Sequence, residues 1–383
     1  MDELVVSANR NVISRKDAPV VVSVASMDLF DAVNSLDLAK SLNYITGLTS
    51  NVALQANQDI TQNAAVASTA QGDVTYSAAT GSITQNAETT ANTGDIAYTA
   101  AQSITQNSAT SIQTGHVNYL ASGNIAQNAN TNVDNGSVVY TAQSGDIVMS
   151  SNALTKVTQG DAHYTATQDI VLGKLDVSEA NQVQLEAVNG SILAQNVEGN
   201  NIQAGTLVMQ AAKDIGGFLA PIKTKISQLF AKSSTQLNMV EQDSLNVKDL
   251  NVSAGNAQLI VGENLQIENA NVSNGLSISA QGNISTTQDG LVQSDLLTVH
   301  AGNGIHLNTA VNSVDLVATQ GSIDLIENDQ ITLNNVNAQN GNISAADDLE
   351  EPADDLEEHA DDLMEPMEDM AGSEDSEEAR AGM

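Results

Sequence analysis

Side chains that could do acid–base, nucleophilic or metal chemistry are few in this chain and far apart. None of the 383 residues is Cys, and the five His residues stand at positions 116, 163, 300, 306 and 359. Only His300 and His306 are near enough in sequence to approach one another across a turn, and this pattern favours solvated, outward-facing histidines over a metal-binding pair. "GNGIHLN", from Gly302, is not a phosphate-binding loop because no Lys-Ser/Thr pair follows it. These residues predict no catalytic centre, no metal site and no cofactor.

Composition limits both the core and the partners. Aromatic residues make up 2 % of the chain and Trp is absent, so the core has to be built from Ile, Val, Leu and Ala. The net charge of −35 argues against a nucleic-acid partner. No apolar run reaches the roughly 18–20 residues of a membrane helix. The start, "MDELVVSANR", lacks the basic and apolar parts of a signal peptide, so we expect none in this chain.

A short motif, apolar-x-apolar-x-Ala, recurs along most of the chain. Its copies are mostly about 21 or 22 residues apart, with one step of 43 after Ala211. They end at Ala56, Ala78, Ala100, Ala121, Ala142, Ala166, Ala187, Ala211, Ala254, Ala280, Ala301 and Ala318. An apolar spacing of two residues indicates strands, and self-similarity at this interval indicates stacked repeats.

Each repeat has room for three short strands. A second apolar segment follows the motif, such as "DITQN" from Asp59 or "SITQN" from Ser82, and a third apolar position, such as Ile112 or Val133, precedes the next Gly. Gly, Asn, Asp and Ser separate these segments and favour turns. The sequence therefore predicts an all-β fold, a parallel β-helix (solenoid) of about a dozen coils over residues 50–345.

Stacked coils place equivalent residues about 4.8 Å apart, so repeated residues should form ladders. We expect a stacked, mostly inward Tyr ladder of Tyr76, Tyr98, Tyr119, Tyr140 and Tyr164. We expect an amide ladder at a turn, made by Asn63, Asn86, Asn107 and Asn128. Gln62, Gln85, Gln106 and Gln127 align with Met149 and Leu172 of later repeats, which suggests inward positions where the amides must be paired.

The repeats resemble the haemagglutinin-type repeats of large bacterial exoproteins and adhesins. The resemblance rests on stretches such as "LSISAQGNISTTQ" from Leu276 and "LTVHAGNGIHLNTA" from Leu297, and covers about residues 50–345. It implies a right-handed β-helical shaft on a secreted or surface-anchored bacterial protein. Host surfaces or glycans are the partners that such a shaft would serve.

Residues 2–48 resemble the start of the plug domain of a TonB-dependent outer-membrane receptor. "ELVVSA" is similar to the TonB box, carried here by Glu3, Leu4, Val5, Val6 and Ser7, which implies a TonB-like partner for the N-terminus. The likeness ends after about 47 residues, and no series of barrel strands follows it. Residues 1–49 are therefore either a plug-like α/β segment or a small α/β cap that shields the first coil.

Two further segments depart from the repeat. In residues 213–236, Pro221 suits a helix start, and Ile222, Ile226, Leu229 and Phe230 share one helical face, so we predict a helical insertion. It would pack on the shaft's flank or form a protrusion that binds a partner or a membrane surface. Residues 346–383 repeat a seven-residue acidic pattern with one Leu or Met per heptad, which predicts a disordered acidic tail.

These observations favour a non-enzymatic, extracellular β-helical shaft of a bacterial surface adhesin or exoprotein. A fragment of a TonB-dependent outer-membrane receptor is the first alternative. A β-helix polysaccharide hydrolase or lyase is the second, although such enzymes cluster Asp, Arg or Lys on one strand face and residues 50–345 contain no Arg.

Overall fold

The structure, a computed structural model, describes residues 51–347. The predicted N-terminal cap, the TonB-box-like residues and the acidic tail beyond residue 347 lie outside the described residues. Ala346 and Asp347 still belong to the last strand.

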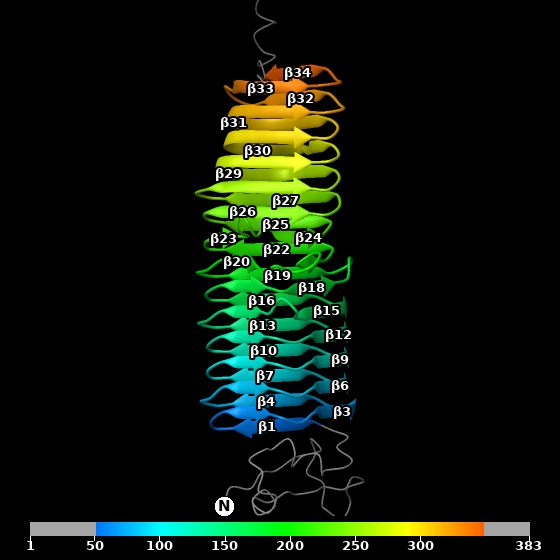
Figure 1. Ribbon diagram of the computed structural model, residues 1–383, viewed down its shortest axis with the longest axis vertical. Coiled ribbons are helices and arrows are strands. Elements are labelled where there is room, and N and C mark those ends of the chain that lie inside the picture. Colours follow the sequence, from blue (N-terminus) through cyan, green and yellow to red (C-terminus); the bar gives the residue numbers. More distant parts are fainter. Residues whose placement is uncertain (1–50, 348–383) are drawn as a thin grey trace, which may run out of the picture. The chain divides into compact units, whose positions relative to one another are not determined.

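The described residues form a parallel β-solenoid of about 14 turns that contains no helix (Figure 1). This confirms the predicted all-β solenoid, with slightly more coils than the dozen expected from the motif. Each strand pairs in parallel with its equivalent in the next coil, and Tyr76, for example, lies in register with Tyr98. At roughly 4.8 Å per coil, the column is about 70 Å long.

Three columns of strands build the first coils. Column 1 consists of β1 (Val52–Ala56), β4 (Val74–Ala78), β7 (Ile96–Ala100), β10 (Val117–Ala121), β13 (Val138–Ala142), β16 (Ala162–Ala166), β19 (Gln182–Ala187), β22 (Thr206–Ala211) and β25 (Gln228–Ser233). Column 2 consists of β2 (Ile60–Gln62), β5 (Ile83–Gln85), β8 (Ile104–Gln106), β11 (Ile125–Gln127), β14 (Ile147–Met149), β17 (Ile170–Leu172), β20 (Ile192–Ala194) and β23 (Asp214–Ile215). Column 3 consists of β3 (Val66–Gln71), β6 (Thr89–Thr93), β9 (Thr110–Thr114), β12 (Thr131–Asn135), β15 (Leu154–Gln159), β18 (Lys174–Val177), β21 (Ile202–Gln203) and β24 (Ile222–Lys225).

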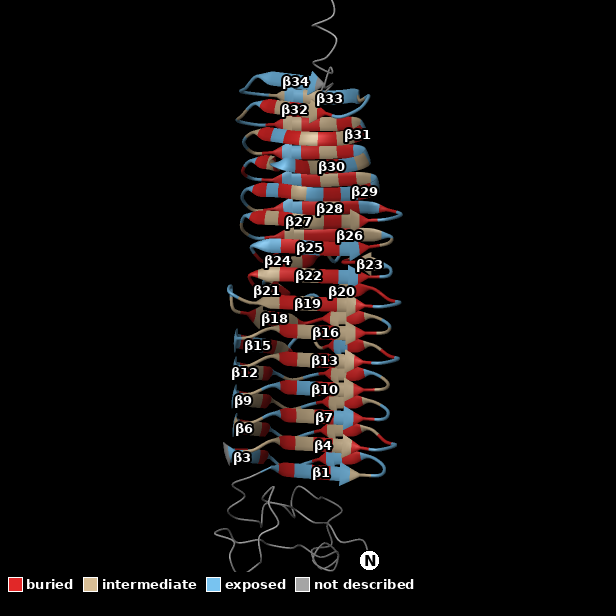
Figure 2. Ribbon diagram, turned by 180° about the vertical axis from the view of Figure 1, so that it is seen from behind, coloured by how far each residue is buried: buried red, intermediate tan, exposed pale blue. Residues whose placement is uncertain are grey.

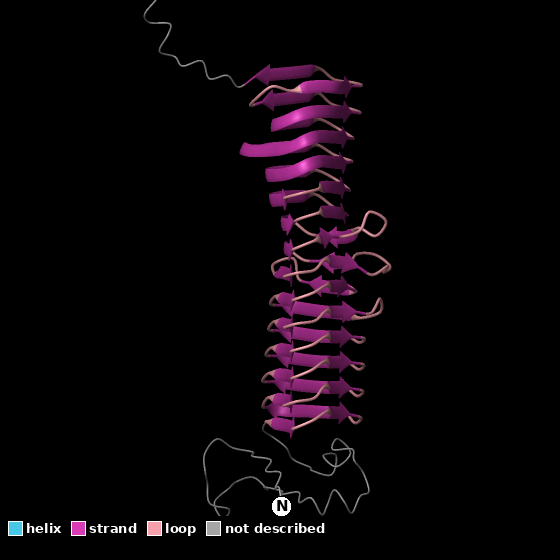
Figure 3. Ribbon diagram, turned by 90° about the vertical axis from the view of Figure 1, so that its left-hand side faces the viewer, coloured by secondary structure: helices cyan, strands magenta, loops and turns pink. Residues whose placement is uncertain are grey.

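Columns 2 and 3 merge at β26 (Gln236–Glu241). The start of β26 pairs with β23 of column 2, and its end pairs with β24 of column 3. Each coil above has two strand segments instead of three. In several of these coils the two segments join into one long strand, visible as a continuous ribbon in Figure 3. Their strands are β27 (Leu245–Val252), β28 (Asn256–Val261), β29 (Leu265–Ala280), β30 (Ile284–Ala301), β31 (Ile305–Ala318), β32 (Ile323–Glu327), β33 (Thr332–Ala338) and β34 (Ile343–Asp347).

The predicted helical insertion at residues 213–236 is wrong. This segment contains β23, β24, β25 and the start of β26, and its buried side chains alternate with period two: Ile222, Thr224 and Ile226 are buried, while Phe230 is 37 % exposed. The helical spacing in the sequence was coincidental, because the neighbouring coils offer every extended backbone segment a hydrogen-bonding partner. Pro221 precedes a strand rather than a helix.

The recurring alanine motif also changes its place in the fold. The copies ending at Ala56 to Ala211 stack in column 1, whereas those ending at Ala280, Ala301 and Ala318 stack above β28 and β26 on the merged column. The 43-residue step contains an additional coil, in which β25 has Ser233 at the place of the alanine. The same alternation serves either column, because both need apolar side chains on their inner face.

The core runs along the axis of the column. Buried and exposed residues alternate along most strands, and the last two strands, β33 and β34, are largely exposed (Figure 2). Ile, Val, Leu and Ala dominate the buried set, with five Tyr as its largest members.

Candidate functional site

The five repeated Tyr rings lie inside the column and stack on one another. Consecutive ring centroids from Tyr76 to Tyr164 are 4.5–4.7 Å apart, and the ring planes are within 10° of parallel. Each ring is at most 1 % exposed. Burial holds the pKa of Tyr98, Tyr119 and Tyr140 well above the usual value, so these phenols remain hydrogen-bond donors. The Tyr row therefore offers no aromatic surface to a ligand.

Buried Thr and Gln side chains pair the Tyr hydroxyls. Tyr119 Oη lies 2.6 Å from the Thr110 hydroxyl and donates to Gln85 Oε1 at 3.3 Å. The Gln85 amide donates in turn to the Thr110 hydroxyl at 3.0 Å. Gln85, Thr110 and Tyr119 belong to β5, β9 and β10, so each such triplet ties three successive coils together.

The same arrangement recurs in neighbouring coils and then ends abruptly. Tyr140 pairs with Thr131 and Gln106, and Tyr164 pairs with Thr155 and Gln127. Above these coils, all three polar positions become apolar together. The replacements in register are Met149 above Gln127, Leu175 above Thr155 and Leu185 above Tyr164. Because Gln, Thr and Tyr are replaced together, none of the three is left buried without the other two as partners.

The repeated Asn residues form an exposed amide ladder. Asn86 donates to Asn63 at 3.0 Å, Asn107 donates to Asn86 at 2.9 Å, and Asn128 donates to Asn107 at 2.9 Å. The chain of amides runs along one corner of the column, where column 2 strands end. Its geometry is that of a structural clamp between coils.

Sequence reasoning missed a second kind of ladder, from side chains to backbone. From β2 to β20, the residue before the column 2 strand accepts a hydrogen bond from the backbone N–H of its equivalent in the next coil, as when Asp59 Oδ1 accepts from Ser82 N at 2.8 Å. Asn124 and Asp169 do the same. A matching row, including Asp73 and Asp95, precedes column 1. The available signal was an Asp, Asn or Ser directly before the first apolar residue of so many strands.

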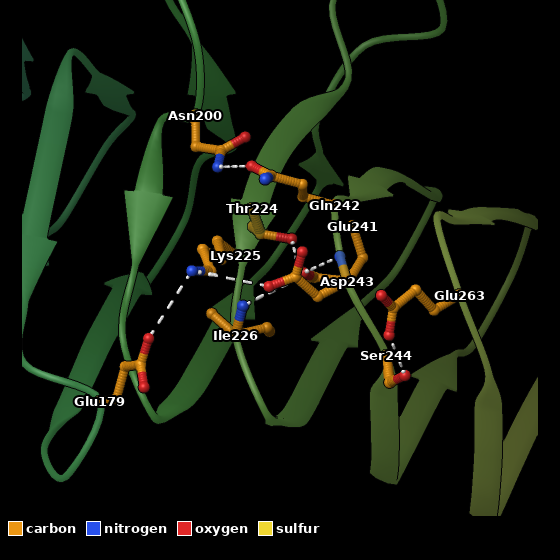
Figure 4. Close-up of polar contacts among 10 residues, drawn as sticks. All are labelled: Glu179, Asn200, Thr224, Lys225, Ile226, Glu241, Gln242, Asp243, Ser244 and Glu263. Atoms are coloured by element: carbon orange, nitrogen blue, oxygen red, sulfur yellow. Dashed lines mark hydrogen bonds and ion pairs between the residues drawn. The ribbon is translucent and has the colours of Figure 1, made fainter.

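Two buried glutamates replace missing strand neighbours. Glu241, only 1 % exposed, accepts hydrogen bonds from the Thr224 hydroxyl at 2.6 Å and from the backbone N–H groups of Ile226 and Asp243 at 3.1 Å each (Figure 4). It ends β26 at the point where columns 2 and 3 merge. The carboxylate therefore pairs the Ile226 N–H, which receives no backbone carbonyl from the coil above.

Glu327, five coils further along the chain, makes the same kind of contacts as Glu241. It accepts from the Thr309 hydroxyl at 2.7 Å and from the Val311 N–H at 3.1 Å, and it is 4 % exposed. In both places a Thr-x-Ile/Val sequence supplies the donors, and the Glu lies in register with the Thr. Recurrence of the same contacts favours a structural role for both carboxylates.

Burial raises the pKa of both Glu241 and Glu327, while the hydrogen bonds from Thr and backbone N–H groups lower it. Asp329 adds to the rise at Glu327. Asp243, Lys225 and Glu179 are charged neighbours drawn with Glu241 in Figure 4, and the Lys225 Nζ lies 3.6 Å from Asp243 and 3.7 Å from Glu179.

We expect Glu241→Gln to change how stability depends on pH. As pH rises, the unfolded chain loses the carboxyl proton near 4.5, before the folded state does. The stability that protonated Glu241 contributes is therefore complete below about pH 4.5 and is lost as pH rises through its raised folded pKa. Gln stays neutral, so the variant's stability relative to wild type should rise over this window, by about 1.4 kcal/mol per unit of pKa shift.

Urea unfolding from pH 4 to pH 8 measures this difference, and Glu327→Gln provides an independent repeat at the second site. Curves for variant and wild type that stay parallel across this range would contradict the prediction.

The two histidines singled out in the sequence are not brought together as a site. His300 lies in β30 between Ser279 and Val317. His306 is the second residue of β31, and its Nδ1 lies 2.8 Å from Asp324 Oδ2. Both are outward. Within residues 51–347, no group of three or more His, Cys, Asp or Glu side chains is arranged to hold a metal ion.

The fold and these interior networks define the class of the chain: the described residues are a parallel β-solenoid protein whose repeated residues clamp coil to coil. Comparisons with protein-family models, with curated proteins and with solved structures returned no significant match. In the part of the chain that the structure describes, no helix is long and apolar enough to cross a membrane.

Proposed function

We propose that this chain is a non-enzymatic, extracellular β-helical shaft of a bacterial surface adhesin or exoprotein. One observation carries the proposal: the residues that repeat, in the buried Tyr row and in the exposed Asn row, contact their equivalents in the next coil, whereas the outward residues of column 1 vary. The inward Tyr of β10, β13 and β16 is constant, while the outward residues one position earlier are Asn118, Val139 and His163. The repeated residues therefore build a scaffold, as the resemblance to haemagglutinin-type repeats implies.

The buried carboxylates support a scaffold role over glycan cleavage. Hydrolysis of a glycosidic bond uses two carboxyl groups about 5–10 Å apart, on either side of a bound sugar. Glu241 and Glu327 lie in different coils, are covered by protein, and accept hydrogen bonds from Thr and backbone donors. Each is explained by the strand edge that it completes.

A paired assay tests the proposal. Beads coated with the purified chain are presented to host-type glycans and to acidic polysaccharides, while new reducing ends are measured in solution. We expect saturable attachment without release of reducing ends, because a shaft binds through its varied outward residues and does not cleave what it binds. Release of reducing ends that is lost when an outward carboxylate such as Asp324 is replaced by Asn would overturn the scaffold proposal in favour of an enzyme.

A further inference from the structure

The connection between β23 and β24 carries the most exposed large apolar side chains of the described residues. Phe218 is 72 % exposed and Leu219 is 93 % exposed, whereas the next such residue, Ile343, is 51 % exposed. They form the tip of a two-residue turn closed by hydrogen bonds between Gly217 and Ala220, at 3.0 and 3.1 Å. Figure 3 shows loops projecting from one side of the column around its middle.

The base of this turn is fixed to the column. The Gly216 N–H donates to the Ile192 carbonyl at 2.8 Å, and the Gly216 carbonyl accepts from the side chains of Gln236 at 3.4 Å and Asn238 at 3.5 Å. Gly216 has φ +67°, and a Cβ there would lie 2.3 Å from the Asn238 carbonyl oxygen. The turn therefore presents its two apolar side chains from a rigid support, which lowers the entropic cost of binding.

Two lysines flank the turn. Lys213 directly precedes β23, and Lys223 is the second residue of β24. Within residues 51–347 neither has an ion-pair partner, whereas Lys225 and Lys232 pair with carboxylates. At physiological ionic strength, charges beyond about 8 Å are largely screened. The carboxylate nearest them in sequence is Asp214, which follows Lys213 and accepts a hydrogen bond from the Thr235 hydroxyl. With two lysines and one aspartate, residues 213–224 keep a net positive charge although the whole chain has −35.

We propose that the turn at Phe218 and Leu219 inserts into the interface of a lipid bilayer, with Lys213 and Lys223 at the anionic headgroups. A tip of two large apolar residues, flanked in the sequence by two lysines, fits the boundary between acyl chains and headgroups. The contact goes beyond the proposed shaft role and does not depend on it. One interpretation of the sequence was a helical protrusion at this segment. The structure has a turn there instead of a helix.

The absence of Trp from the chain allows a direct test. Phe218→Trp places one fluorophore at the tip, and Phe230→Trp, on the outer face of column 1 at 37 % exposure, is the matched control. Both proteins are mixed with vesicles of phosphatidylcholine alone and with vesicles containing roughly 30 mol % phosphatidylglycerol, an anionic lipid that attracts lysines near the membrane surface. We expect Trp at position 218, and not at 230, to shift its emission to shorter wavelengths and to be quenched by brominated acyl chains.

Two further variants separate the apolar and the ionic contributions. Phe218→Ser with Leu219→Ser should lower the vesicle partition coefficient at least tenfold, roughly the loss of one buried apolar side chain. Lys213→Gln and Lys223→Gln should each lower binding to the anionic vesicles by about fivefold and leave phosphatidylcholine binding unchanged. Unchanged emission at position 218 in both vesicles, or an equal shift at position 230, would overturn the proposal. Glycan attachment that persists in the double Ser variant would show that the two proposals stand separately.

Discussion

Replacing Tyr119 with Ala is expected to lower the free energy of unfolding by about 3–5 kcal/mol. The ring is fully buried and lies 4.5 Å from the rings of Tyr98 and Tyr140, so its removal opens a cavity between two neighbours. Thr110 and Gln85 also lose the hydroxyl with which they pair. The cost is smaller to the extent that the adjacent coils collapse into the gap.

The loss should appear first as local unfolding. Coils of a solenoid contact only their neighbours, so destabilisation is confined to nearby coils before it spreads. Hydrogen exchange is expected to rise across residues 95–145 before it rises across residues 276–325. Chemical denaturation gives the total change in the free energy of unfolding.

Tyr119→Phe is the matched control, because it keeps the ring and removes only the hydroxyl. It should cost about 0.5–1.5 kcal/mol, the net contribution of a typical hydrogen bond, because Thr110 and Gln85 still pair with one another. Leu120→Ala, at the adjacent outward position, should cost less than either. A Tyr119→Ala variant that loses under about 1 kcal/mol would be incompatible with a tightly packed Tyr ladder.

Replacing Gly136 with Ala is expected to cost about 3–5 kcal/mol, the sum of backbone strain and overpacking. Gly136 has φ +144°, a region that side chains rarely adopt, and a Cβ there would lie 1.8 Å from the Gly115 carbonyl oxygen in the coil below. The obstacle is backbone and cannot rotate away. Gly94, Gly115 and Gly160 occupy the same corner with φ between +124° and +135°.

Gly199→Ala separates the two contributions. Gly199 also has a positive φ, +77°, but an added Cβ would meet no atom within 4 Å. This variant should lose only about 1–2 kcal/mol, the strain of a left-handed residue. Thermal unfolding of both variants measures the difference, and equal losses would show that close approach between coils is not what requires Gly136.

Much of the fold could be predicted because its signals are local and repeated. Alternation in "VTYSA" and "IAYTA" predicts strands, and the 21- or 22-residue interval predicts that they stack. The inward placement of Gln106 could be inferred because later repeats have Met149 and Leu172 at this place. Its partners could not be, since Thr131 and Tyr140 come from the two following coils.

Segment 213–236 shows where local patterns fail. The spacing of Ile222, Ile226 and Leu229 fits one face of a helix. It also fits two strands joined by a bend, which is the observed structure, and there all three side chains are buried. The choice was made by the coils above and below, which offer unpaired backbone groups to any extended segment. A helix would have left those groups without partners.

By itself, the sequence determined the all-β class, the coil length and the residues that repeat, because alternation and period are properties of neighbours along the chain. The tertiary structure decided how the coils change along the column: where columns 2 and 3 merge, why Glu241 and Glu327 are buried, and which side chain accepts from which backbone N–H. Each of these depends on groups about 15–25 residues apart that meet only after stacking. Pairing of buried polar groups between coils is settled in three dimensions, since it requires both partners to be in place at once.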